Sequence, residues 1–196
     1  MSFAKHIHLS LLATALLAIP AISAADNLIE ISNPADFIHK ETVEISTYEG
    51  DPATGTKTGP QQCFALKAIG DDEGNRWVAF LKKRLQIDSA VRYRFRCSLF
   101  AEGEASISVS GGAADAEHQG VGDPAGHTFG YTLKSEDGQA LIKAPTGGWL
   151  AMEAIVGPGG ETDWPAGAAE TNFAINIKAE PGTVVYVKDL SVEEVR

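Results

Sequence analysis

Apolar and polar residues alternate strictly between Val91 and Leu99, where the sequence reads V-R-Y-R-F-R-C-S-L. Successive side chains of a β-strand point to opposite faces, so this pattern predicts a strand with one apolar face and one cationic face. Such a strand belongs to a sheet that packs against a core on one side only. The pattern therefore predicts a one-sided sheet, and it places three arginines on an outward surface.

Similar apolar runs, separated by Gly, Pro and Asp turn signals, predict further strands. The predicted strands cover residues 27–31, 42–48, 61–69, 76–87, 105–110, 129–134, 149–156, 172–178 and 184–192. No segment after the first 24 residues predicts a helix, and residues 111–126 form a predicted loop rich in Gly, Ala and Asp. About nine or ten strands without βαβ alternation predict an all-β protein, an antiparallel jelly-roll β-sandwich.

Residues 1–24 have the features of a signal peptide. Lys5 precedes an apolar run over residues 9–19, and small residues end the segment at Ala24. The run is shorter than the roughly 20 residues that span a bilayer, and no later apolar run is long enough to do so. We therefore expect cleavage after Ala24 and export to the periplasm, the cell surface or the medium. Residues 25–196 are predicted to form a single β-sandwich domain.

The charge of the chain narrows the class of partner. The sequence has 26 acidic and 16 basic side chains, a formal net charge of −10. Removal of residues 1–24 takes away one lysine and no acid, which makes the charge −11 over 172 residues. An acidic chain of this kind is not expected to bind nucleic acid.

Both cysteines, Cys63 and Cys97, lie within predicted strands. Export to an oxidising compartment permits a disulfide between them, whereas two buried free thiols would give the same sequence pattern. The sequence leaves both alternatives open.

Four segments resemble, in order, the motifs of one family. They are Asn27-Leu28-Ile29 followed by Asn33, Val91-Arg92-Tyr93-Arg94-Phe95, Thr146-Gly147-Gly148-Trp149, and the closing run from Gly182 to Val192. Together they resemble the jelly-roll carbohydrate-binding modules of families 4, 9 and 22, which share a galactose-binding-like β-sandwich. The resemblance implies that fold, and it implies non-catalytic binding of a polysaccharide.

The same resemblance bears on a metal. Members of the family often bind a structural calcium near the two chain ends, and Asp189 matches one acid of the usual pair in their closing strand. Lys188 stands where the second acid is usual. Calcium takes about six to eight oxygen ligands, and a neighbouring ammonium group opposes its binding. We therefore predict no cofactor, with a structural calcium at Asp189 as the alternative.

Sugar recognition needs a flat aromatic ring that stacks on a pyranose and polar groups that contact its hydroxyls. Trp164 is the predicted stacking residue because it lies in a loop without hydrophobic periodicity, beside the acceptors Glu161 and Asp163. In the alternative, Trp164 anchors the loop against the sandwich. Trp77 and Trp149 begin predicted strands, and both are predicted to pack structurally.

Arg92, Arg94 and Arg96 form a second candidate surface on the cationic face of their strand. Arginine forks suit bidentate recognition of carboxylate or sulfate groups on an anionic polysaccharide. The alternative is ordinary decoration of a sheet, in which these arginines pair with acids on neighbouring strands.

An enzymatic function is an alternative to binding, and it has three candidate residues. His118, His127 and Tyr131 lie in or beside the long loop, where a small polysaccharide lyase or hydrolase could use one of them as a base. No nucleophile and base have a recognisable spacing, and no metal-ligand spacing repeats. We therefore predict no catalytic residues.

Taken together, the sequence predicts a stand-alone exported module that binds a polysaccharide or other glycan without catalysis. Its predicted partners are that glycan and separate carbohydrate-active enzymes. A structural or assembly protein of the cell surface, without a ligand site, is the competing interpretation of a different class.

Overall fold

The computed structural model describes residues 26–39, 41–57, 62–70, 74–122 and 129–195. The predicted signal peptide lies outside these ranges. No helix within them has the length and apolar character that a membrane span requires. The described residues form thirteen strands and one short 3-10 helix, η1 (Pro34–Asp36), which confirms the prediction of an all-β protein.

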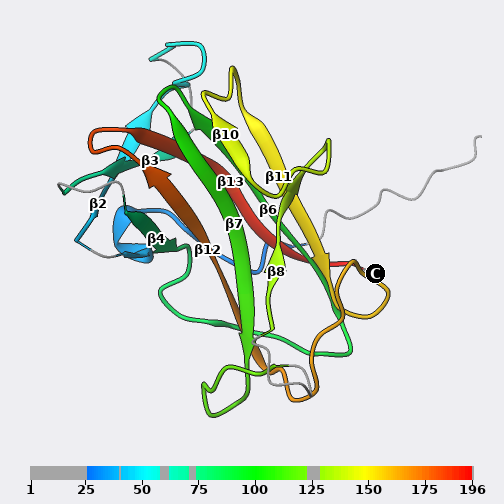
Figure 1. Cartoon of the computed structure of the whole chain (residues 1–196). Helices are drawn as coiled ribbons and strands as arrows, with labels where there is room; N and C mark the ends of the chain where they lie inside the picture. The colour runs from blue at the N-terminus through cyan, green and yellow to red at the C-terminus, as the bar shows by residue number, and fades with distance from the viewer. Residues whose placement is uncertain (1–25, 40, 58–61, 71–73, 123–128, 196) are drawn as a thin grey trace, which may run out of the picture.

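Sheet one contains seven strands (Figure 1). They are β1 (Ile38–His39), β4 (Asn75–Ala79), β5 (Leu85–Gln86), β7 (Ala105–Ala114), β8 (Tyr131–Thr132), β10 (Ile142–Ala144) and β12 (Glu170–Ala179). The order is β1-β4-β12-β7-β10, with β5 beside β12 and β8 beside β7. All pairings are antiparallel, and the pairing of β12 with β7, over ten residue pairs, forms the centre of this sheet.

Sheet two contains six strands in the order β2-β3-β13-β6-β11-β9. They are β2 (Val43–Glu49), β3 (Gln62–Ala68), β6 (Arg92–Ala101), β9 (Lys134–Ser135), β11 (Leu150–Val156) and β13 (Val184–Val195). All of these pairings are antiparallel as well. The chain crosses from one sheet to the other between β6 and β7, between β11 and β12, and between β12 and β13, as in a jelly-roll sandwich.

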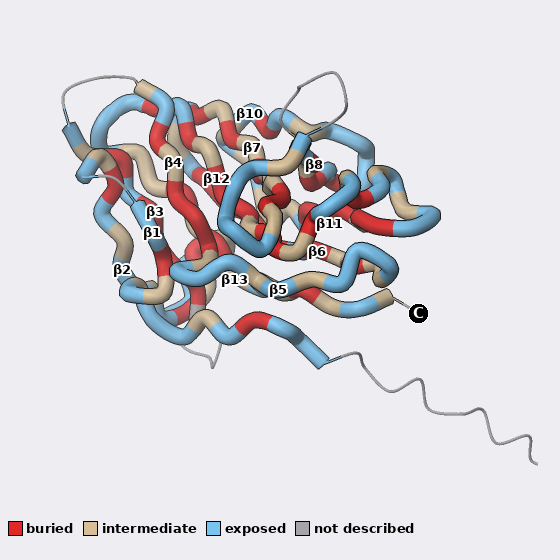
Figure 2. Tube along the Cα trace, turned by 90° about the horizontal axis from the view of Figure 1, so that it is seen from below, coloured by how far each residue is buried: buried red, intermediate tan, exposed pale blue. Residues whose placement is uncertain are grey.

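The core lies between the two sheets, and buried positions alternate with more exposed ones along the long strands (Figure 2). On β6, Tyr93, Phe95, Cys97 and Leu99 are all buried at 3% exposure or less, and the arginines between them face outward. The predicted one-sided strand is therefore confirmed.

The N-terminal segment over residues 27–31 is not the strand that the sequence predicts. The Asn27 side chain instead holds it beside β13: its Nδ2 donates to the Leu190 carbonyl at 3.2 Å, and its Oδ1 accepts from the Val192 amide at 2.9 Å. The Leu28 amide donates to the Val192 carbonyl at 2.8 Å. One side-chain amide thus replaces part of a strand ladder.

Several strand boundaries also differ from the prediction. The predicted strand over residues 129–134 is two short strands, β8 in sheet one and β9 in sheet two. The predicted strand over residues 76–87 is likewise divided into β4 and β5. β7 extends four residues into the predicted loop, and the short strands β1 and β10 lack the length that a periodic pattern needs.

Arg76 on β4 is the largest side chain that is fully buried, with 1% exposure. Its Nε donates to the Thr42 carbonyl at 3.1 Å, and its Nη1 donates to the carbonyls of Gly74 at 2.9 Å and Ala179 at 2.6 Å. Its Nη2 lies 3.4 Å from the Ile69 carbonyl. One guanidinium therefore joins the ends of β3 and β12 to the starts of β2 and β4.

Cys63 and Cys97 are both buried free thiols, so the disulfide alternative does not hold. They lie on β3 and β6, which are separated by β13. Two strand spacings amount to about 9–10 Å, whereas a disulfide needs Cα atoms within about 7 Å. Cys97 points into the core, and Cys63 points to the other face because its neighbour Phe64 is a core residue.

We expect two thiols per chain to react with a thiol reagent after unfolding in urea, and none to react quickly in the folded protein. Burial raises the pKa of Cys63 to about 11, which leaves little reactive thiolate at neutral pH. Dithiothreitol should leave the melting temperature unchanged. A melting temperature that falls in dithiothreitol would show that the chain contains a disulfide after all.

Candidate functional site

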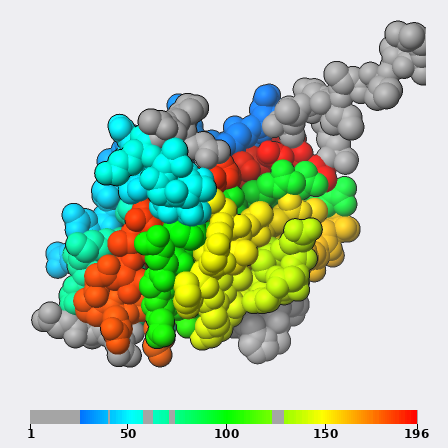
Figure 3. Space-filling view, turned by 90° about the horizontal axis from the view of Figure 1, so that it is seen from above, coloured from blue at the N-terminus to red at the C-terminus, as the bar shows by residue number. Residues whose placement is uncertain are grey.

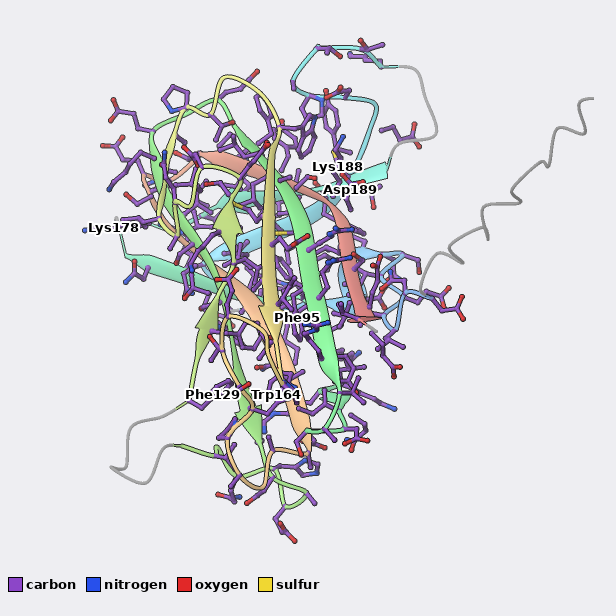
Figure 4. The ribbon with its side chains drawn as sticks, turned by 90° about the vertical axis from the view of Figure 1, so that its right-hand side faces the viewer. Phe95, Phe129, Trp164, Lys178, Lys188 and Asp189 are labelled. Carbon is purple, nitrogen blue, oxygen red and sulfur yellow. The ribbon has the colours of Figure 1, made fainter. Side chains whose placement is uncertain are left out.

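Trp164 lies in the core and not on the surface, with 8% exposure. Its indole Nε1 donates to the Val91 carbonyl at 3.1 Å, and Figure 4 shows it between the sheets near Phe95. Its ring lies about 6 Å from four aromatic rings, those of Tyr93, Phe95, Phe129 and Tyr131. Trp164 therefore offers no open ring face to a sugar, and the loop-anchor alternative describes it.

Glu161 and Asp163 are exposed, as predicted for the loop that contains them. The Glu161 carboxylate accepts a hydrogen bond from Lys134 Nζ at 2.6 Å. Without an exposed indole beside them, these two acceptors do not form the predicted stacking site.

The predicted arginine stripe exists on the outer face of sheet two, but a single acid, Glu153, already pairs with two of its members. Arg96 Nε donates to Glu153 Oε2 at 2.6 Å, and Arg94 Nε lies 3.6 Å from the same oxygen. Arg92 Nη1 lies 3.5 Å from the Gly159 carbonyl. This arrangement matches the alternative, in which the arginines pair across strands.

Asp189 lies at an irregularity of β13, where the register shifts between Lys188 and Ser191. Its backbone is left-handed, with φ 54°, and its Oδ2 accepts from Ser98 Oγ at 2.8 Å. Among the described residues, no group of three or more Asp, Glu, His or Cys side chains could hold a metal. The structural calcium at Asp189 stays a prediction, and among the described residues the Asn27 side-chain amide links the N-terminal segment to β13.

The two described residues of the enzyme alternative, His118 and Tyr131, do not share a cleft. Tyr131 is buried, its hydroxyl lies 3.2 Å from Thr171 Oγ1, and burial raises its pKa far above the usual range. His118 is exposed, and its Nδ1 lies 2.7 Å from Glu170 Oε2 in a hydrogen bond that lowers the pKa of Glu170. His127 lies outside the described residues.

The other two tryptophans, Trp149 and Trp77, differ in the contacts that their indoles make. The Trp149 indole N–H donates to Asp51 at 2.8 Å, and Lys188 Nζ lies over the ring at 4.2 Å from its centre. Both the N–H and the ring of Trp149 thus contact neighbouring residues, as the prediction of a packing role expects. Trp77 is only partly buried, and within the described ranges its indole N–H has no hydrogen-bond partner.

Trp77 lies on the outer face of sheet one, in a row of uncharged polar residues. Asn176 on β12 is paired in register with Trp77 on one side and with Ser108 on β7 on the other. Directly opposite residues in a sheet have Cβ atoms about 5 Å apart. Asn176 Nδ2 also lies 3.5 Å from Ser110 Oγ. An indole, an amide and two hydroxyls, all partly exposed, therefore share the outer face of sheet one.

The strands β12, β7 and β10 run side by side in this sheet, as the orange, green and yellow bands of Figure 3 show. Ala79 and Ala174 form the next row beyond Trp77 and Asn176, and both are buried although they face outward. The row on the other side ends in a hollow of about 440 Å³. This hollow contains Ser106, Lys143, Lys178, Glu104 and Glu180 among its lining residues.

Sequence reasoning missed this surface although a signal exists. Ser106, Ser108 and Ser110 alternate with the core residues Ile107 and Val109, so the three serines must share the outer face of their strand. Trp77 precedes the core residue Val78, which by the same rule turns the indole outward. The prediction of a packing role for Trp77 rested on its place at the start of a strand and did not use this alternation.

No family model matches the sequence, and no curated protein matches it. Solved structures resemble the fold. The CBM22-1 xylan-binding domain of Paenibacillus barcinonensis Xyn10C aligns with a TM-score of 0.52 and 8% identity, over 88% of this chain and 97% of that domain. TmCBM61 in complex with β-1,4-galactotriose aligns with a TM-score of 0.51 and 8% identity, over 87% of this chain and all of that one.

A third structure belongs to a larger protein. It is the enzymatically active domain of tailspike protein 4 from bacteriophage CBA120, with a TM-score of 0.51 and 9% identity. The alignment covers 82% of this chain and 19% of the tailspike chain. At these identities the comparisons establish the fold and not the ligand. The chain has the jelly-roll fold of the carbohydrate-binding modules.

Proposed function

We propose that the protein binds a neutral polysaccharide, without catalysis, through the outer face of sheet one. The row of Trp77, Asn176 and Ser108 is the observation that carries this proposal. The fold supports it, because two of the similar structures are a xylan-binding domain and a module in complex with β-1,4-galactotriose. We further propose that residues 1–24 export the protein, so that it meets its ligand outside the cytoplasm.

The chemistry of this face suits a sugar chain. The indole ring of Trp77 supplies an apolar plane for a pyranose, and its free N–H can donate to a hydroxyl. The Asn176 amide carries both donors and acceptors, as sugar hydroxyls do. The row itself is uncharged, and the paired arginines of sheet two leave little reason to expect an anionic polymer. We therefore propose a neutral ligand, with soluble xylan and β-1,4-galactan as the first probes.

Replacing Trp77 with alanine should weaken binding to the polysaccharide that the wild type binds by at least tenfold. A tenfold loss is about 1.4 kcal/mol, which is moderate for an aromatic residue at the centre of a binding surface. Affinity electrophoresis and titration calorimetry would measure the loss. Because Trp77 is outside the core, the melting temperature of the Trp77→Ala protein should stay close to that of the wild type.

Leu28→Ala is the matched control, because Leu28 is an apolar side chain with 38% exposure in the segment beside β13 of sheet two, away from the proposed row. It should bind like the wild type. If Trp77→Ala binds as well as the control to every polymer that the wild type binds, the proposed surface is wrong.

A further inference from the structure

A second hollow lies on the opposite side of the sandwich. It is a groove of about 670 Å³ on the outer face of sheet two, within the range of about 300–1,000 Å³ that is usual for small-molecule sites. Figure 4 shows the two sides, with Lys178 on one and Asp189 on the other. Ser98 on β6 and Ala151 on β11 are paired in register and belong to its lining. Both side chains are small, which leaves the middle of the groove open.

Two ion pairs border this groove, and both are short. Arg96 on β6 donates to Glu153 on β11, and Lys134 on β9 donates to Glu161, each at 2.6 Å. Glu153 is paired in register with both Arg96 and Lys134, so the four groups come from three adjacent strands and one loop. These pairs hold long side chains in place, which lowers the entropy that a ligand must remove on binding.

Each pair leaves hydrogen-bonding capacity that faces no other described residue. Glu153 and Glu161 use one carboxylate oxygen, Oε2, and their Oε1 atoms have no partner within the described ranges. The Nη atoms of Arg96 and two of the three Lys134 donors also remain available, since only the bonds given above use these groups. Donors and acceptors therefore alternate along the groove.

This alternation selects the class of ligand. A hydroxyl group both donates and accepts, so neighbouring hydroxyls of one sugar ring can satisfy a carboxylate and a cation at the same time. An anionic ligand would meet the carboxylates of Glu136, Glu153, Glu161 and Asp189 against only two cations in the lining. Stacking contributes little here, because none of the described residues that line the groove is aromatic.

We propose that this groove is a second saccharide site, which binds a short neutral oligosaccharide through hydrogen bonds. It does not use Trp77 and lies on the other sheet, so the protein can hold two saccharide chains at once. This proposal is independent of the proposed site on sheet one, and either can fail alone.

Amide chemical shifts test the groove directly in the Trp77→Ala protein, titrated with xylohexaose and with β-1,4-galactotriose. We expect the amides of Ser98, Ala151 and Glu153 to shift and saturate with one of these oligosaccharides. Ala151→Phe in the same background should weaken that binding at least tenfold, because the added ring fills the groove. Ala151 is exposed, so the substitution should leave the fold intact.

The matched control is Ser106→Phe in the same background, which adds a ring to the outer face of sheet one and should leave the groove shifts unchanged. The proposal is overturned if neither neutral oligosaccharide shifts the groove amides, or if Ala151→Phe binds like its parent. It is also overturned if only an anionic oligosaccharide, such as hexagalacturonate, binds the groove. Loss of sheet-one shifts in Trp77→Ala, compared with the wild type, reports on the first site alone.

Discussion

Replacing Arg76 with methionine is expected to lower the free energy of unfolding by about 4 kcal/mol. The guanidinium donates to backbone carbonyls in four chain segments, and the side chain is 1% exposed. A buried acceptor that loses its donor destabilises a protein by about 1–3 kcal/mol, and methionine replaces none of these donors. Urea denaturation followed by circular dichroism would measure the change.

Lys83→Met is the matched control, since it removes a cation of similar length from an exposed loop position. Surface changes of this kind usually alter stability by less than about 0.5 kcal/mol. Arg76→Lys should fall between the two, because an ammonium group cannot reach carbonyls on four sides. If the free energy of unfolding of Arg76→Met lies within about 1 kcal/mol of that of Lys83→Met, the guanidinium does not hold these segments together.

Trp164→Ala is expected to destabilise the protein by about 3–5 kcal/mol, the range for removal of a large aromatic side chain from a core. The ring contacts four other aromatic side chains, and its N–H satisfies the Val91 carbonyl. The melting temperature, measured by calorimetry, should fall by many degrees. Trp164→Phe should lose less stability, because it keeps an aromatic ring in the cavity.

The same two variants separate packing from binding. If Trp164→Phe remains folded, it should bind polysaccharide with the affinity of the wild type, because Trp164 has no exposed ring face. A variant that keeps its melting temperature but loses affinity would restore Trp164 as a ligand residue.

Alternation of apolar and polar side chains was sufficient to predict β6, the strand that pairs with both β13 and β11 in sheet two. The run from Val91 to Leu99 has one face that must be buried, and β6 buries that face. Alternation gives the parity of each residue but not the neighbour of each strand. The split of residues 129–134 between two sheets therefore could not be predicted, since one short run of residues contributes to both β8 and β9.

The tryptophans show the same limit at the level of the site. A loop without periodicity gave no reason to bury Trp164, because the aromatic side chains that surround it come from residues 93 to 131, distant along the chain. Trp77 was predictable from parity, since Val78 beside it is apolar and buried. The charges that border the groove meet only through the pairing of β9, β11 and β6, which no local pattern specifies.

The attachment of Asn27 to β13 determines how the molecule can be displayed. Because these two hydrogen bonds hold Asn27, at the beginning of the described residues, beside β13, a tether attached near Asn27 or after β13 leaves from sheet two. A sensor chip or bead coupled through such a tether would leave the Trp77 surface facing the solution. The same coupling would crowd the groove of sheet two, so immobilised protein should report mainly on the Trp77 surface and protein free in solution on both.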